Sequence, residues 1–345
     1  MYRALLSLAY ILLARAADPE PGETCMKNGA VVCVTGGSGY LGIEVVAQLL
    51  AEGYEVKATV RSLTNEGKVA PLRNLDFADE RLTILEADLL KPGSFDECVR
   101  GASVVFHTAS PFKIAGVQDP EAELIRPAVE GTETVLEAAV AAGVKRVVLT
   151  SSIAAIMGRP TDKEGCFNED DWNLSSTLDG DGLDWYRLSK TKAERRAWEI
   201  AENSSLEMAT ICPSIIIGPP RTSRTDSESL QLMAAVLKGG EPTRGASPMV
   251  DVRDCAAAHI AAARIPEAKG HRFLTTTERP VEPTEVIDAA KNGVPELVSP
   301  DLGKPSLPEG RRRLFCSKTV GMLGVEFRSA GESLEEMAIK MSSFR

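Results

Sequence analysis

Three side chains of the sequence have the types and spacing of a proton-transfer site. Tyr186 and Lys190 are four residues apart in a helical pattern, so they share one helix face. A phenol has a pKa of about 10, and a nearby ammonium lowers it by favouring the phenolate. The tyrosine can then exchange a proton with a carbonyl or alcohol oxygen. Ser152, thirty-four residues before Tyr186, supplies a hydroxyl that can bind the same oxygen.

The serine assignment has two candidates, because Ser151 and Ser152 both follow an apolar run from residue 147 to 149. Successive side chains of an extended strand point to opposite faces, so only one of them can face the site. A Tyr-x-x-x-Lys spacing alone recurs on helices by chance. The specific signal is the order along the chain, in which a serine and then the Tyr–Lys pair follow a dinucleotide-type loop.

That loop is the glycine-rich segment from Thr35 to Gly42, which contains the GxGxxG spacing. It follows a short apolar run typical of a buried parallel strand and precedes a helical pattern through Leu41, Val45 and Leu49. Glycines there allow a tight turn and a close approach of backbone N–H groups to a pyrophosphate, which the positive end of the helix also attracts. This context is the one that the motif requires, so it predicts a dinucleotide site.

The residue at the end of the second expected strand indicates which of the two nicotinamide coenzymes is bound. An NAD site has an acidic residue there to bind the ribose 2′-hydroxyl, whereas this sequence has Arg61. An arginine fork suits a 2′-phosphate, and Lys68 adds a second positive charge. Asp88, after the third expected strand, can accept from the adenine amino group or serve as a turn residue. The sequence therefore predicts NADP(H).

Other chemistry has little support in the sequence. His107 ends an expected strand, where a packing histidine is favoured over a catalytic base. No group of His, Cys, Asp and Glu residues has the spacing of a metal site. The net charge of −10, with no basic block interleaved with aromatic residues, argues against nucleic-acid binding, and the Arg311–Arg313 triplet is expected in a solvated loop.

The elements that must position these residues alternate between strand and helix. Strand patterns cover residues 30–35, 55–60, 82–86, 103–107, 144–150 and 207–212, and the clearest helical patterns cover 121–142 and 184–202. This succession predicts an α/β fold with a Rossmann-type, doubly wound parallel sheet. After Pro213 the pattern weakens, with helices expected at 230–237, 250–264 and 334–340. We therefore divide the chain into an NADP-binding domain at 28–213 and a smaller substrate-binding lobe at 214–345.

The first 27 residues are treated as a leader. Arg3 precedes an apolar run from Ala4 to Ala14, a weak signal-peptide pattern that is too short to span a bilayer.

The seven cysteines have no zinc-type spacing, and Cys33 lies in an apolar strand pattern, so reduced, buried thiols are expected. Both the thiols and the fold favour a cytoplasmic location, although the leader leaves a secretory or organellar route open.

The chain resembles the extended short-chain dehydrogenase/reductases, and within them the dihydroflavonol reductase and cinnamoyl-CoA reductase type. The resemblance extends over residues 30–338 and rests on the segments TGGSGYLG, TVRS with Lys68, EADL, FHTASPF, VVLTSSIAAI, DWYRLSK, ICPSIIIGPP, VDVRDCAAAH and LGVEFRS. It implies that Ser152, the second serine of the pair, is catalytic with Tyr186 and Lys190. The coenzyme contacts that it implies are Thr35, Gly36, Gly37, Ser38, Gly39, Tyr40, Leu41, Gly42, Arg61, Lys68, Asp88, Leu89, Thr108, Ala109, Ser110, Tyr186, Lys190, Pro213, Ser214, Ile215 and Ile216.

Two departures from that family concern the substrate. Dihydroflavonol reductases have an amide side chain five residues after the serine, where this chain has the apolar Met157. Cinnamoyl-CoA reductases have NWYCYGK where this chain has DWYRLSK. The sequence therefore predicts an NADPH-dependent reductase of a small-molecule aldehyde or ketone, and it fixes neither the substrate nor the oligomeric state.

Three alternatives stay open from the sequence. The first is a sugar-nucleotide epimerase or dehydratase on the same fold, which Arg61 disfavours because those enzymes hold NAD. The second is a hydroxysteroid dehydrogenase. The third is a regulator that binds a dinucleotide without chemistry, for which loss of Tyr186 or Lys190 would be expected.

Overall fold

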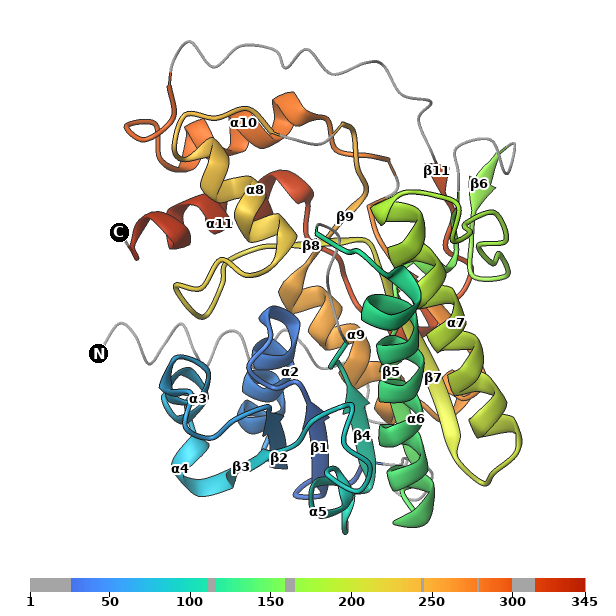
Figure 1. The fold of residues 1–345 in the computed structure, drawn as a ribbon. Coiled ribbons are helices and arrows are strands. Elements are labelled where there is room, and N and C mark those ends of the chain that lie inside the picture. Colours follow the sequence, from blue (N-terminus) through green and yellow to red (C-terminus); the bar gives the residue numbers. More distant parts are fainter. Residues whose placement is uncertain are drawn as a thin grey trace.

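A computed structural model describes residues 26–110, 116–158, 165–242, 245–277, 279–299 and 314–344. Its centre is a seven-stranded, all-parallel sheet with the order β10-β7-β5-β4-β1-β2-β3 (Figure 1). The predicted Rossmann-type sheet is therefore confirmed. Its strands are β1 (Val31–Thr35), β2 (Glu55–Val60), β3 (Leu82–Glu86), β4 (Val104–His107), β5 (Arg146–Thr150), β7 (Glu207–Pro213) and β10 (Arg272–Thr275).

Both faces of this sheet are covered, which explains why its strands are continuous apolar runs. In β1, Val32 and Val34 belong to the core on one face, and Cys33 belongs to the core on the other. One face packs against α2 (Tyr40–Ala51) and α9 (Val252–Arg264), and the other against α5 (Asp96–Val99), α6 (Arg126–Ala141) and α7 (Gly182–Glu202). The short α3 (Glu66–Arg73) and α4 (Ala78–Arg81) connect β2 to β3, and a π-helical turn, η1 (Glu121–Ile125), precedes α6.

A smaller lobe has its own apolar core at one end of the sheet. Figure 1 shows its three helices grouped away from α6 and α7. Helix α8 begins after Ser227 and α11 after Ser329, and each serine side chain accepts a hydrogen bond from an N–H group of the first turn. The elements of the lobe are β8 (Ile215–Ile217), α8 (Glu228–Val236), β9 (Met249–Asp251), α10 (Pro283–Gly293) and α11 (Ala330–Ser342).

The chain passes between the two parts more than once. The predicted boundary at residue 213 marks the point where the chain first leaves the sheet. It then enters the lobe through β8 and α8, returns as α9 and β10, and leaves again into α10. Strand β10 pairs with β7 and α9 covers the same core as α2, so these two elements belong to the part that contains the seven-stranded sheet, although they follow residue 213. No helix in the described ranges is long and apolar enough to cross a membrane.

The expectation of reduced thiols is wrong for four cysteines. Cys33 of β1 is joined to Cys98 of α5, and Cys166 is joined to Cys316, with Cα–Cα distances of 5.9 and 5.8 Å. No local pattern predicts these pairings, because the partners are 65 and 150 residues apart. Cys212 and Cys255 are free and buried, as expected. Residues 1–25 of the leader, which include Cys25, and the Arg311–Arg313 triplet lie outside the described residues.

The Cys166–Cys316 disulfide lies beside two short parallel strands, because Cys166 begins β6 (Cys166–Phe167) and Cys316 follows β11 (Leu314–Phe315). Beside it, the Glu169 carboxylate accepts hydrogen bonds from the backbone of Leu274 and Lys318, at 3.1 and 2.8 Å. These contacts hold the segment before α11 against the sheet edge at β10. The 3-10 turn η4 (Val320–Leu323) continues this segment.

We expect the Cys166→Ser/Cys316→Ser protein to unfold with a free energy lower by about 2–4 kcal/mol, because a cross-link across a long loop restricts the unfolded chain. Urea denaturation of both proteins measures the difference. Peptide mapping without reductant should recover Cys166 and Cys316 in one linked pair, and recovery of two separate peptides would contradict the pairing.

Candidate active site

The glycine loop joins the end of β1 to the start of α2. Gly36 has φ +67°, and a Cβ there would lie 2.9 Å from the Cα of Ala109. A Cβ on Gly42 would collide with the carbonyl oxygen of Gly36. Gly39 is the N-cap of α2 and offers no side chain, and the first turn of that helix contains no acidic residue. The loop is thus as tight as a pyrophosphate cradle requires, and a helix N-terminus opens beside it.

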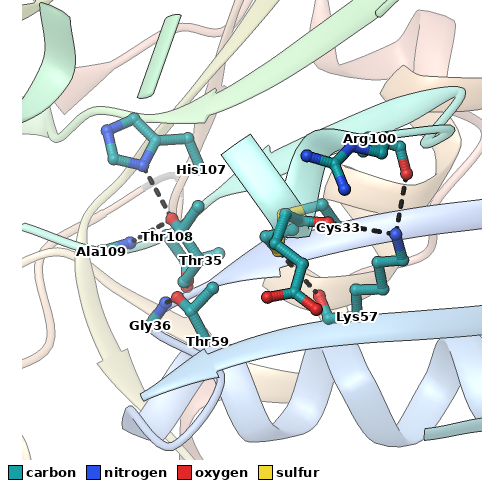
Figure 2. The surroundings of a disulfide bond; sticks show 11 residues. Cys33, Thr35, Gly36, Lys57, Thr59, Arg100, His107, Thr108 and Ala109 are labelled. Carbon is teal, nitrogen blue, oxygen red and sulfur yellow. Dashed lines mark hydrogen bonds between the residues drawn. A yellow bond between two sulfur atoms is a disulfide. The ribbon is translucent and has the colours of Figure 1, made fainter. Parts of the chain in front are cut away.

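A buried polar cluster fixes this loop to the end of β4 (Figure 2). Thr35 and His107 share a hydrogen bond of 2.8 Å, and the hydroxyl of Thr108 donates to the Thr35 carbonyl at 2.7 Å. The backbone N–H of Ala109 donates to the Thr35 hydroxyl at 3.2 Å. Burial, followed by the Lys190 charge, lowers the pKa of His107 to about 3. The ring is therefore neutral at pH 7 and serves packing, as expected from its place on the strand.

The two cations predicted for the 2′-phosphate lie after β2. Arg61 is exposed directly beyond the strand end. Lys68, on α3, donates to the Asp226 carboxylate at 2.8 Å. Asp226 also forms an ion pair with Arg224, whose guanidinium donates to the Ser38 carbonyl at 2.6 Å. The segment after β8 thus contacts both the glycine loop, at Ser38, and one of the two predicted phosphate cations, Lys68.

Two more contacts fasten the start of α2 to the segment after β8. The Tyr40 hydroxyl donates to the Gly218 carbonyl at 2.6 Å, and Arg221 pairs with the buried Glu44 at 2.5 Å. Burial, followed by the charges of Asp251 and Glu44, raises the pKa of Tyr40, which keeps its phenol protonated. The side chain of Tyr40 therefore joins two segments of this protein. No local pattern predicts these contacts, because Tyr40 and Gly218 are 178 residues apart in the sequence and Glu44 and Arg221 are 177 residues apart.

The predicted adenine contacts lie after β3. Asp88 is exposed, and its carboxylate accepts from the N–H of Leu90 at 2.9 Å, so it closes a turn. Its backbone carbonyl accepts from the Ser94 hydroxyl at 2.7 Å. Leu89 lies against Gly131 of α6, where a Cβ would approach its side chain to 3.0 Å. The turn and adenine roles of Asp88 are compatible, because an Asx turn leaves the second carboxylate oxygen for another donor.

The Tyr–Lys pair lies in the first turns of α7. The helix begins after Asp181, whose carboxylate accepts from the N–H groups of Leu183 and Asp184 at 2.9 and 3.1 Å. Lys190 is 9% exposed, and its Nζ lies 5.9 Å from the centre of the Tyr186 ring. The ammonium donates to the Ser110 hydroxyl at 2.9 Å, which places it at the carboxyl end of β4.

The two serines after β5 have different surroundings. Ser151 donates its hydroxyl hydrogen to Glu194 at 2.7 Å, in the interior behind α7. Ser152 is the N-cap of a 3-10 turn, η2 (Ile153–Ala155), and its Oγ accepts from the N–H of Ala154 at 3.1 Å. Among the described residues no acceptor is found for the hydroxyl hydrogen of Ser152, which can therefore be donated to a substrate oxygen. This difference favours Ser152 as the residue that binds a substrate oxygen, in line with the resemblance.

A buried hydroxyl without a partner lies at the end of β7. Ser214 is 7% exposed, and among the described residues its Oγ has no hydrogen-bond partner. It stands between Pro213, the last residue of β7, and Ile215, the first of β8, within the segment predicted to flank the nicotinamide. An unpaired buried hydroxyl is costly unless a ligand or water satisfies it. The segment therefore fits a polar group such as the carboxamide of a nicotinamide.

Sequence comparison identifies the family. The model of the NAD dependent epimerase/dehydratase family matches residues 32–274, from β1 through β10. The chain belongs to this family. Within the family it is 39% identical over 324 residues to a cinnamoyl-CoA reductase of Medicago truncatula, covering 89% of this chain and 96% of that protein. It is 36% identical to a tetraketide alpha-pyrone reductase of Arabidopsis thaliana, covering 88% of this chain and 93% of that protein.

Similar solved structures agree with the sequence relatives. The yeast methylglyoxal/isovaleraldehyde reductase complexed with NADPH superposes with a TM-score of 0.78, at 27% identity, over 91% of this chain and 98% of that one. These relatives confirm the predicted kinship with the dihydroflavonol and cinnamoyl-CoA reductase group, in which a dihydroflavonol 4-reductase of Pyrus communis is 32% identical.

Proposed function

We propose that this protein is an NADP(H)-dependent oxidoreductase that reduces the carbonyl group of an aldehyde or ketone to an alcohol. The observation that carries the proposal is the placement of Tyr186 and Lys190. They share one face at the start of α7, and Lys190 is buried against Ser110 at the carboxyl end of β4. In open α/β sheets, ligands bind at this edge.

Each proposed catalytic residue has a defined task. Ser152 donates a hydrogen bond to the carbonyl oxygen and orients it, and Tyr186 gives that oxygen a proton. The Lys190 ammonium lies beside the phenol and stabilises the phenolate that remains after the transfer. Burial lowers the pKa of Lys190 to about 8, so the amine is still mostly protonated at pH 7. Bound coenzyme would supply the hydride.

The coenzyme would be held by the segments described above. The glycine loop from Thr35 to Gly42 and the N-terminus of α2 suit the pyrophosphate. Arg61 and Lys68 suit the 2′-phosphate, and Asp88 with Leu89 suits the adenine. Backbone groups of 108–110 and the segment 213–216, with the unpaired Ser214 hydroxyl, suit the nicotinamide end. NADPH bound to the yeast reductase supports the same choice of coenzyme.

The alternatives are less well supported. An epimerase or dehydratase that retains NAD would have an acidic residue in place of Arg61. A regulator without chemistry would have no need of a buried lysine beside a tyrosine. Met157 packs against the core that contains Ile153, Phe167 and Phe315, so this end of the site presents apolar side chains. We therefore expect an apolar group on the carbonyl substrate.

The cytoplasm is the compartment proposed from the fold. The two disulfides are more typical of oxidising compartments, which makes the secretory route the alternative. Fractionation of cells that express the full-length tagged chain distinguishes the two locations.

Arg61→Glu should reverse the coenzyme preference. We expect NADPH affinity to fall roughly 10- to 100-fold, because a charge-assisted phosphate contact is lost and a like charge takes its place. NADH affinity should stay unchanged or improve. Fluorescence titration with both coenzymes measures the change, and a panel of aldehydes and ketones assayed by loss of reduced nicotinamide tests the reaction.

Arg73→Glu is the control, since Arg73 is an exposed cation on α3 that pairs with Glu66. It should leave both affinities as they are. Tighter binding of NADH than of NADPH by the unmodified protein would contradict the assignment of Arg61 to the 2′-phosphate. Absence of turnover across the carbonyl panel would contradict the proposed reaction.

A further inference from the structure

The catalytic face of α7 continues inward to a buried carboxylate that the proposed reaction does not use. Glu194 is four residues after Lys190 and eight after Tyr186, so the three side chains follow one stripe of the helix. Glu194 is 1% exposed. A charged group buried this deeply destabilises the fold unless it is paired and hydrogen-bonded, so the groups that stabilise the Glu194 carboxylate matter.

Four donors surround this carboxylate. Arg272 donates two hydrogen bonds to it, from Nε to Oε1 at 2.6 Å and from Nη2 to Oε2 at 3.0 Å. The Ser151 hydroxyl donates to Oε2 at 2.7 Å, and the indole N–H of Trp198 donates to Oε1 at 3.3 Å. The thiol of Cys212 on β7 also approaches Oε2, at 4.0 Å. Both carboxylate oxygens are therefore directed by partners from the sheet as well as from α7.

Arg272, the main partner, is itself fixed. It is 8% exposed on the edge strand β10, and its Nη1 donates to the carbonyls of Glu169 and Asp171 at 2.7 and 2.6 Å. Its guanidinium lies over the Trp172 ring, 3.9 Å from the ring centre. A guanidinium held on three sides defines where the Glu194 carboxylate must lie, and through it the rotation of α7.

One carboxylate thus links the two segments that carry the proposed catalytic groups. Ser151 is the neighbour of Ser152, while Tyr186 and Lys190 lie on the helix of Glu194 itself. We propose that Glu194 is a positioning residue with two effects. Its carboxylate, held in place by Arg272, fixes the serine turn, formed by Ser151, Ser152 and η2, against α7. It also supplies a negative charge one helical turn from Lys190. This inference rests on the proposed reduction for its effect on turnover, but its electrostatic part can be measured without it.

The charges around Lys190 give the direction of the electrostatic effect. Burial lowers the pKa of Lys190 to about 8, and the Glu194 charge opposes this decrease. The other titratable groups that face Lys190 are Tyr186 on α7, the neutral His107 on β4 and the Cys212 thiol on β7, with Arg272 behind Glu194. Removal of the Glu194 charge therefore lowers the pKa of Lys190 further, and the amine loses its proton nearer to neutral pH.

The test uses Glu194→Gln in the full chain. We expect kcat for carbonyl reduction at pH 7 to fall about tenfold while the NADPH Kd changes less than about twofold, because the coenzyme loop is untouched. The alkaline decline of kcat should move to lower pH. Glu194→Asp keeps the charge and should restore the position of that decline. Glu199→Gln is the matched control, because Glu199 is an exposed glutamate on the same helix that pairs with Arg196.

A second measurement reports on Lys190 without turnover. In protein labelled with [ε-13C]lysine, the Lys190 signal is identified by its loss in Lys190→Arg, and its titration gives the pKa directly. It should move to lower pH in Glu194→Gln and stay in place in Glu199→Gln. An unmoved titration would overturn the inference even if no carbonyl substrate is found. Conversely, a shifted titration in a protein that reduces no carbonyl would refute only the proposed function.

Ser151→Ala guards against a Glu194→Gln protein that does not fold. It removes only the link to the serine turn and leaves the Glu194–Arg272 pair in place. We expect kcat to fall several-fold with the Lys190 titration unchanged, because the turn is loosened and the charge is kept. Turnover equal to that of the unmodified protein would show that the carboxylate does not position the serine turn.

Discussion

The Tyr186→Phe protein should bind NADPH normally and reduce carbonyl substrates at about one-thousandth of the normal rate. The change removes the proton donor, and general acid catalysis contributes about 10²- to 10⁴-fold. The ring itself stays, so its packing at the start of α7 and its place over the Lys190 ammonium are kept. Stopped-flow measurement of a single turnover with bound NADPH isolates the chemical step.

Tyr54→Phe is the matched control for that change. Tyr54 lies in the turn before β2, and its hydroxyl accepts hydrogen bonds from Arg264, far along the chain from α7. The control should lose some stability and keep its turnover. Equal turnover in Tyr186→Phe and the unmodified protein would mean that another group supplies the proton.

Gly42→Ala should nearly abolish coenzyme binding. The added methyl group collides with the carbonyl oxygen of Gly36, a backbone atom that cannot rotate away. Either α2 or the loop must shift, and the N–H groups at the start of α2 then no longer converge on a pyrophosphate. We expect the NADPH Kd to rise at least about 100-fold, since loss of two charge-assisted hydrogen bonds to the pyrophosphate costs about 3 kcal/mol or more.

The control for this glycine is Gly331→Ala. Gly331 is also helical, on α11, and a Cβ there meets nothing within 4 Å. This substitution should leave coenzyme affinity unchanged and raise stability slightly, because alanine is the better helix former. Isothermal titration of both variants with NADPH gives the comparison, and near-normal affinity in Gly42→Ala would show that the pyrophosphate binds elsewhere.

Local patterns carried most of the correct predictions from the sequence. Strand β1 is recognisable because a parallel strand buried on both faces is a continuous apolar run, and the Gly36–Gly42 loop because its φ angles and close contacts exclude side chains. Helices α7 and α9 lie within two residues of the bounds predicted from their helical pattern, and in the structure an aspartate caps the start of each one. Helix α10 was not predicted, although Pro283 at its first position and the capping box between Glu282 and Glu285 are local signals of a helix start.

The rest of the site depends on contacts between distant residues. Glu194 and Arg272 are 78 residues apart, and the spacing of Glu194 from Lys190 was the only sequence signal for its place. The family resemblance favoured Ser152 over Ser151, whereas the hydrogen bond from the Ser151 hydroxyl to Glu194, which supports the same choice, has no signal in the sequence. The pairing of Lys68 with Asp226 spans 158 residues. Such contacts follow from the folded topology and not from local periodicity.

The route of the chain between the sheet and the small lobe limits how this protein can be re-engineered. Replacement of residues 214–345 by those of a relative would also replace β10, which pairs with β7, and α9, which packs on the same core as α2. It would replace Arg272 as well, and the Glu194 carboxylate would then lose its main hydrogen-bond partner. A chimaera with altered substrate choice should therefore keep residues 249–275 from the recipient and graft the flanking stretches as two separate inserts.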